Sequence, residues 1–125
     1  MCGRYSLAGP DLGQVRERFA LGGDVPVERR FNIAPGQDVL AVTAERGGEL
    51  LRWGLVPHWA ESPKVGYRLI NARAETVAER PAFREAFAQR RCLILADGFY
   101  EWQPRVHGPK QPGWTTREDG AAFAI

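Results

Sequence analysis

Short apolar segments separated by polar breaks run along this chain, and most of them are too short to form stable helices. Residues 38–44 and 50–56 are two such segments on either side of Arg46-Gly47-Gly48-Glu49, a pattern that predicts a β-hairpin. Residues 92–96 (Cys-Leu-Ile-Leu-Ala) are apolar throughout and predict a central strand. The pattern therefore indicates a protein built mainly from strands.

Further segments are predicted to be extended. Residues 2–7 predict a strand with Tyr5 and Leu7 on one face. We expect residues 67–70 and 99–102 to be extended, residues 60–66 and 103–113 to be loops, and residues 115–125 to form a last hairpin around Glu118-Asp119-Gly120.

Two segments have helical spacing. Leu12, Val15 and Phe19 recur at helical intervals after Pro10, with Arg16-Glu17-Arg18 facing solvent and Gly22-Gly23 as the expected end. Residues 81–89 predict a second helix with Phe83 and Phe87 one turn apart. The fold class is therefore predicted to be α+β, mainly antiparallel strands with two or three short helices.

The composition fits one globular domain covering residues 1–125. The sequence has no apolar run of membrane-spanning length and no apolar segment of a signal peptide near Arg4. Its two cysteines are too few for a disulfide framework and suggest a reducing compartment. The net charge of +2 is weak support for a polyanionic partner, and 15 of the 17 basic residues are Arg, a bias that suits phosphate binding or reflects genome composition.

Cys2 carries the most distinctive chemistry, because removal of Met1 leaves an α-amine and a thiol on one residue. Their ordinary pKa values are about 7.7–8.0 and about 8.5, so both are partly deprotonated near neutral pH. The amine can condense with an aldehyde to an imine, and the thiolate can close on the imine carbon to give a thiazolidine. The alternative is that Cys2 is a small apolar residue in a terminal strand.

Glu101 lies between aromatic residues in Phe99-Tyr100-Glu101-Trp102, and a carboxyl in an apolar setting can act as general acid or base. The alternative is an exposed glutamate on a strand. Asn71 and Arg73 flank Ala72 and would point the same way in an extended chain, where they could grip a phosphate. A turn-capping asparagine followed by a surface arginine explains them equally well.

Arg4 is two residues from Cys2, and its charge beside the thiol would favour the thiolate, unless it is simply solvated. Trp53 and Trp59, with Pro35 and Pro57, could form a stacking platform for unpaired bases, although tryptophans more often lie in a core. His58 and His107 have no partner at a metal-binding spacing and are expected in surface loops, so we predict no metal. Cys92 is expected to be inert in the core.

Five segments, taken together, resemble the SOS-response-associated peptidase (SRAP) family, whose members sense abasic sites in single-stranded DNA. They occur in the family's order and extend to about Trp102: Met1-Cys2-Gly3-Arg4-Tyr5, Phe31-Asn32-Ile33-Ala34-Pro35-Gly36, Arg52-Trp53-Gly54-Leu55 with Pro57 and Trp59, Ile70-Asn71-Ala72-Arg73-Ala74-Glu75-Thr76, and Ala96-Asp97-Gly98-Phe99-Tyr100-Glu101-Trp102.

The resemblance implies a pseudo-barrel of mainly antiparallel strands with a positively charged groove. It implies that Cys2, after loss of Met1, captures the ring-opened aldehyde of an abasic site, with Asn71 beside it and Glu101 as the acid/base carboxylate. Arg4 and Arg73 match residues that hold the DNA backbone. Asn32, Pro35, Trp53 and Trp59 match the groove that contacts bases. No cofactor is implied, and we expect a monomer in the bacterial cytoplasm, near the nucleoid, with no membrane partner.

One departure from the family is clear. Family members are longer and carry a catalytic histidine in a His-x-Arg-Met-Pro type segment, which this sequence lacks. We therefore expect a domain that is incomplete at its C-terminal end, weakly stable and weakly active by itself, with an open sheet edge at residues 121–125. Two other functions stay open: a cysteine peptidase acting on Met1 or on other proteins, and a single-strand binder without covalent chemistry.

Overall fold

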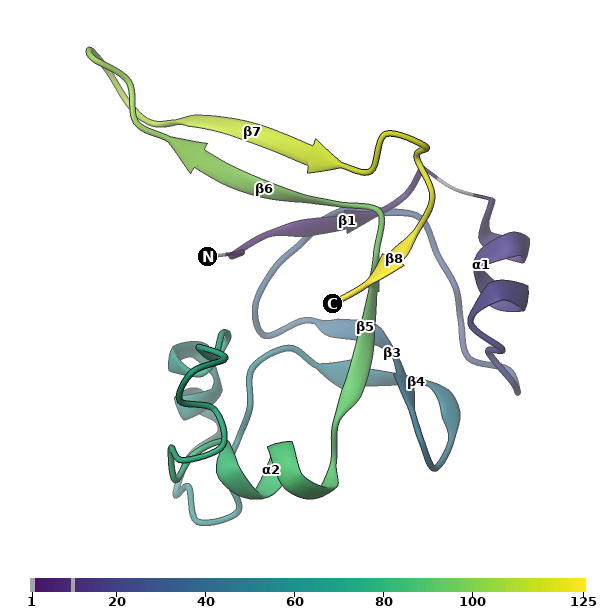
Figure 1. Cartoon of the computed structure of the whole chain (residues 1–125), viewed down its shortest axis with the longest axis vertical. Coiled ribbons are helices and arrows are strands. Elements are labelled where there is room, and N and C mark those ends of the chain that lie inside the picture. The colour runs from purple at the N-terminus through teal and green to yellow at the C-terminus, as the bar shows by residue number, and fades with distance from the viewer. Residues whose placement is uncertain (1, 10) are drawn as a thin grey trace.

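The chain forms two four-stranded antiparallel sheets flanked by short helices, in a computed structural model that describes residues 2–9 and 11–125 (Figure 1). The first sheet has the order β2 (Arg30–Ile33), β1 (Tyr5–Leu7), β6 (Gly98–Gln103), β7 (Gln111–Thr116). The second has the order β4 (Gly47–Arg52), β3 (Asp38–Thr43), β5 (Cys92–Ala96), β8 (Phe123–Ala124). The helices are α1 (Leu12–Arg18), the 3₁₀ helix η1 (Pro63–Arg68) and α2 (Arg84–Gln89). The predicted α+β class is confirmed.

The two sheets share one chain segment. β5 ends at Ala96 and β6 begins at Gly98, so the chain crosses from the second sheet to the first through Asp97 alone. In Figure 1 the β6–β7 hairpin extends away from the rest of the molecule, while β5 runs back toward β3. One hydrophobic core lies under both sheets and α1, and its buried members include Leu7, Val15, Val39 and Leu95.

Helix α1 forms where its apolar spacing predicts, and Val15 is its buried residue. Its N-cap is Asp11, whose carboxylate accepts hydrogen bonds from the backbone of the first turn. The helix ends before the expected glycines, because Ala20 already adopts a left-handed conformation (φ 49°). The prediction that Arg16 faces solvent is wrong, since its guanidinium donates to the carbonyl oxygens of Leu21, Gly23 and Val25. The expected role of Pro10 in the first turn lies outside the described residues.

The predicted hairpin is confirmed as β3 and β4, paired from Asp38↔Arg52 to Thr43↔Gly47. Its turn is residues 44–46 rather than 46–49, and its second strand is Gly47–Arg52 rather than residues 50–56. The predicted central strand is β5, which pairs with β3 on one side and β8 on the other. Its apolar residues are not all buried, since Leu95 is 0% exposed and Leu93 is 49% exposed. The expectation that Cys92 is core is therefore wrong, because this residue lies at the half-buried start of the strand.

Several expected boundaries are corrected. The first strand starts at Tyr5 rather than Cys2. Residues 67–70 are not extended, because Ser62 caps the 3₁₀ helix and Pro63 starts it. The second helix begins at Arg84, three residues late.

The prediction that residues 115–125 form a final hairpin is also wrong. β7 pairs with β6, whereas β8 pairs with β5 in the other sheet. The loop predicted for residues 103–113 is shorter, because β7 is an edge strand and an edge tolerates Pro112. β8 forms an edge of the second sheet, as expected for that part of the chain. None of the helices within residues 2–9 and 11–125 is long and apolar enough to cross a membrane.

Candidate active site around Cys2

Cys2 is half-buried just before β1, and two hydrogen bonds fix its position. Its thiol donates to the carbonyl oxygen of Arg4 (3.3 Å), and its own carbonyl oxygen accepts from Nδ2 of Asn71 (2.8 Å). Asn71 is 69 residues away in the sequence and follows the segment that contains η1. The predicted neighbours Cys2 and Asn71 are therefore in direct contact.

Glu101 reaches the same place from β6. The backbone N–H of its neighbour Tyr100 donates to the carbonyl oxygen of Arg4 (2.9 Å), the oxygen that also accepts from the Cys2 thiol. Burial raises the pKa of the Cys2 thiol above its ordinary value, and the negative charge of Glu101 raises it further. Three segments distant in sequence thus bring a thiol, an amide and a carboxylate together.

The prediction that the charge of Arg4 lowers the pKa of the Cys2 thiol is wrong. The sequence predicts that the charge of Arg4 favours the thiolate, but the pKa of the Cys2 thiol is raised. The Arg4 guanidinium instead donates to Oδ1 of Asn32 (3.0 Å) on β2. Arg4 and Asn32 therefore form a pair at one side of Cys2, and Asn32 is exposed.

Asn71 and Arg73 line one hollow of the surface, together with Thr76, Glu79, Arg80 and Pro81. The chain is not extended after Arg73, because the carbonyl oxygen of Arg73 accepts from the N–H groups of Thr76 and Val77. Two arginines and an amide can hold an anionic group here. Asn71 and Arg73 therefore line the same hollow, as predicted, and a turn begins directly after Arg73.

The two predicted stacking tryptophans have different surroundings. The Trp53 ring packs against Tyr5 (centroids 5.3 Å apart), and its Nε1 donates to the carbonyl oxygen of Ile70 (3.0 Å), directly before Asn71. Trp59 is 56% exposed. Pro35 is half-buried and Pro57 is buried, so Pro57 presents no accessible face to a base. Trp53 therefore supports the position of Asn71, and Trp59 is the accessible ring.

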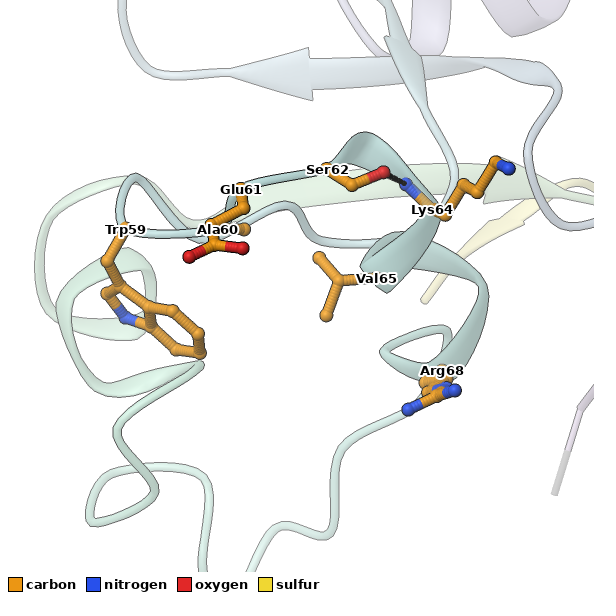
Figure 2. A pocket seen from close by; sticks show the side chains of 7 residues that line it. All are labelled: Trp59, Ala60, Glu61, Ser62, Lys64, Val65 and Arg68. Carbon is orange, nitrogen blue, oxygen red and sulfur yellow. Dashed lines mark hydrogen bonds between the residues drawn. The ribbon is translucent and has the colours of Figure 1, made fainter.

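Trp59 forms one wall of a pocket at the start of η1 (Figure 2). Ser62 caps this helix by accepting from the N–H of Lys64, and Arg68 lies across the pocket from the Trp59 ring. The pocket combines an aromatic face with Arg68 and a single carboxylate, Glu61, whereas the side chain of Lys64 points away from it (Figure 2). That combination suits stacking of a base next to a phosphate.

Histidine and metal chemistry have little support in the described part of the chain. His58 Nδ1 lies 3.0 Å from Glu85 Oε2, and both residues are exposed, as is His107. No group of three or more His, Cys, Asp or Glu side chains within residues 2–9 and 11–125 is arranged to hold a metal ion.

Two further residues near the site, Asp97 and Ser6, are buried and paired, which the sequence did not predict. Asp97 is 2% exposed and Ser6 is buried, and they are joined by a hydrogen bond of 2.6 Å. The Asp97-Gly98 pair is typical of a turn, so only its place between two apolar segments could have indicated burial.

Sequence comparison assigns the class of protein that this fold and site represent. The family of SOS response associated peptidases (SRAP) matches residues 1–125. The chain therefore belongs to the SRAP family.

Individual relatives agree with this assignment. The chain is 38% identical to the abasic site processing protein YoaM of Bacillus subtilis over 131 aligned residues, which cover 100% of this chain and 57% of YoaM. It is 42% identical to the abasic site processing protein HMCES of Xenopus tropicalis over 76 residues, which cover 58% of this chain and 22% of HMCES. The chain thus spans little more than half the length of YoaM.

Two crystal structures share the fold. A protein from Bacteroides thetaiotaomicron superposes with a TM-score of 0.84 at 24% identity, over 99% of this chain and 58% of its own. A protein from Bordetella bronchiseptica superposes with a TM-score of 0.77 at 30% identity, over 99% of this chain and 61% of its own. The two-sheet arrangement is therefore common to longer proteins.

Proposed function

We propose that this chain processes abasic sites in single-stranded DNA by covalent capture through Cys2, as part of a DNA damage response. The observation that carries the proposal is the convergence of Asn71 on the Cys2 backbone and of the Glu101 charge on the Cys2 thiol. The names of YoaM and HMCES, abasic site processing proteins, support the choice of substrate.

The proposed chemistry starts with the free α-amine of Cys2. The amine nitrogen adds to the aldehyde carbon of the ring-opened sugar, and loss of water gives an imine. The sulfur then bonds to the imine carbon while the thiol proton moves to the nitrogen, which closes a thiazolidine. The Glu101 carboxylate, whose charge acts on the thiol, would carry protons in both steps. Asn71 holds the Cys2 carbonyl and so limits the rotation of the nucleophile.

Removal of Met1 is the step that prepares this nucleophile. The raised pKa of the Cys2 thiol keeps it protonated near neutral pH. A new ammonium on Cys2 itself would lower this pKa, because a positive charge favours the thiolate. Self-removal of Met1 would be a peptidase reaction at the same site and is our second candidate activity, favoured by the nearby thiol and carboxylate. Met1 lies outside the described residues.

DNA binding is assigned to the polar and aromatic residues around Cys2. Arg4 and Arg73 would contact backbone phosphates on two sides of the lesion. Asn32, Pro35 and Trp59 would contact the flanking bases, with Trp53 as support. The modest net charge of +2 makes local clustering of arginine, rather than overall charge, the source of affinity.

The test is incubation with a single-stranded oligonucleotide that carries one abasic site. We expect an adduct that survives heating without borohydride in the wild type and in Cys92→Ala, and none in Cys2→Ala. Intact mass should show that Met1 is absent and that one DNA strand has been added. An adduct that forms equally in Cys2→Ala would refute the proposal.

The same variants separate the alternatives. A non-covalent binder would associate in a salt-sensitive manner with the abasic oligonucleotide and with an undamaged one of the same sequence, and it would form no adduct. A peptidase without DNA chemistry would cleave a fluorescent peptide added in trans, Cys2→Ala would abolish that cleavage, and neither protein would form an adduct.

A further inference from the structure

The buried Asp97 side chain joins the start of β6 to the end of β1. One of its carboxylate oxygens accepts from the Ser6 hydroxyl (2.6 Å), and the other accepts from the N–H groups of Ala8 (2.7 Å) and Gly9 (2.5 Å). The Asp97 N–H donates in turn to the Ser6 carbonyl oxygen (2.9 Å). The residue that precedes β6 is therefore fixed to the end of β1 and to the turn after it.

The same cluster includes β7. The Trp114 indole donates to the Ser6 hydroxyl oxygen (2.9 Å), and the Thr116 hydroxyl donates to the Asp97 carbonyl oxygen (2.6 Å). Each donor and acceptor named here is paired, which gives a buried carboxylate the satisfied environment that it needs. Asp97 thus joins β1, β6 and β7 at one end of the first sheet.

This end of the sheet decides where the proposed catalytic groups lie. β1 and β6 pair through Tyr5↔Phe99 and Ser6↔Gly98, and the N–H groups of Tyr100 and Asp97 donate to the carbonyl oxygens of Arg4 and Ser6 at the two ends of this short ladder. Cys2 lies in the segment just before β1, and Glu101 lies on β6 beyond the paired residues. A slip of one residue would turn Glu101 to the opposite face of β6 and away from the thiol.

We propose that Asp97, acting with Ser6, is a positioning residue that sets the register of β1 against β6 and thereby places Glu101 beside Cys2. The inference rests on the proposed function of Cys2 and Glu101 and deepens it. Asp97 is buried, so it acts on the reaction only through the strands that it joins.

The main test is Asp97→Asn, which keeps the shape of the side chain but replaces one carboxylate oxygen by an N–H₂ group. The amide side chain can then accept either from the Ser6 hydroxyl or from the N–H groups of Ala8 and Gly9, but not from both sides, and the negative charge is lost. The first readout is the thiol pKa of Cys2, measured by pH-dependent alkylation resolved by peptide mass spectrometry. Apart from burial, the groups of the described residues that act on this thiol are the Arg4 carbonyl oxygen, whose hydrogen bond lowers the pKa, and Glu101, whose charge raises it. Cys92 is an internal reference, because its pKa is raised by burial and by Glu49 in the other sheet.

If Asp97→Asn moves Glu101 away from the thiol, the pKa of Cys2 should fall toward its value in Glu101→Gln, and the pKa of Cys92 should stay unchanged. The second readout is the rate of adduct formation with abasic DNA, expected to fall about 10- to 100-fold for a displacement of this kind. Val15→Ala serves as the control for lost stability, since Val15 is buried in α1.

A decisive contradiction would be an Asp97→Asn protein with the Cys2 pKa of the wild type and the adduct rate of Val15→Ala. Should Asp97→Asn fail to fold, Ser6→Ala decides, because it keeps both backbone donors to the carboxylate. It should change the Cys2 pKa in the same direction by less, and no change would overturn the inference. The alkylation readout uses no DNA, so it tests Asp97 even if the wild type forms no adduct.

Discussion

The Cys2 thiol has a carboxylate as its charged neighbour, although a nucleophilic cysteine is usually activated by a positive charge. The pKa of this thiol is raised by burial and by Glu101, so near neutral pH it is mostly protonated. Glu101 therefore opposes formation of the thiolate while offering a base for its proton. At the scale of the residue, the site favours proton transfer during the reaction over a thiolate formed beforehand.

Glu101→Gln should consequently change two reactivities in opposite directions. Loss of the negative charge lowers the Cys2 pKa, so at any pH below that pKa the thiolate fraction and the alkylation rate rise. The rise is at most about tenfold when the pKa falls by one. Adduct formation with abasic DNA should fall, because the proton carrier is lost.

The measurement is the alkylation rate of Cys2 between about pH 7 and pH 9, with Glu118→Gln in the exposed loop after β7 as a matched control. Equal alkylation rates in Glu101→Gln and Glu118→Gln would show that Glu101 does not act on the thiol.

At the scale of the element, the segment before Asn71 is held by a close crossing of two backbones. Gly54 has φ 117°, and a Cβ at this position would lie 2.5 Å from the carbonyl oxygen of Gly66 in η1. The N–H of Leu55 donates to the carbonyl oxygen of Leu69 (3.1 Å), and the Trp53 indole binds the next carbonyl, that of Ile70. Residues 53–55 thus fix the chain that delivers Asn71 to Cys2.

Gly54→Ala should be strongly destabilising and should displace Asn71. Its conformational cost is about 1–2 kcal/mol, and the clash with Gly66 adds about 1–3 kcal/mol. Gly120→Ala is the matched control, since Gly120 also has a positive φ (66°) but no atom within 4 Å of the added Cβ. Urea denaturation should give the larger loss for Gly54→Ala, and equal losses would contradict the proposed crossing.

At the scale of the whole molecule, β5 and β6 form one continuous path through both sheets. Leu95 lies on β5 just before the crossing at Asp97 and is completely buried in the shared core. Leu93, two residues earlier on the same strand, is about half exposed. The core is therefore concentrated at the junction of the sheets rather than along the full length of β5.

Leu95→Ala should lower the free energy of unfolding by about 2–5 kcal/mol, because it leaves a cavity in the shared core. Leu93→Ala should cost much less, since its side chain already contacts solvent. Both values follow from urea denaturation monitored by tryptophan fluorescence. Similar losses of unfolding free energy in Leu95→Ala and Leu93→Ala would contradict a core concentrated at the junction of the sheets.

Local sequence was sufficient for the elements that depend on local physics. The β3–β4 hairpin follows from two apolar segments separated by a short polar break, although the turn itself is residues 44–46 and the two glycines begin β4. Helix α1 follows from the spacing of Leu12, Val15 and Phe19. Residues 115–125 could not be assigned in this way. Whether a strand pairs with its neighbour or with a strand of another sheet depends on distant partners, here β6 and β5.

The sequence by itself determined the α+β class and named the residues that meet at the site, because Cys2, Asn71 and Glu101 stand in motifs with recognisable chemistry. Only the tertiary structure decided how they meet. Asn71 contacts Cys2 across 69 residues of sequence, and Asp97 is buried against Ser6 across 91. The raised pKa of the thiol likewise depends on burial and on the distant Glu101. Local patterns carry no information on such contacts, because burial and charge act through space.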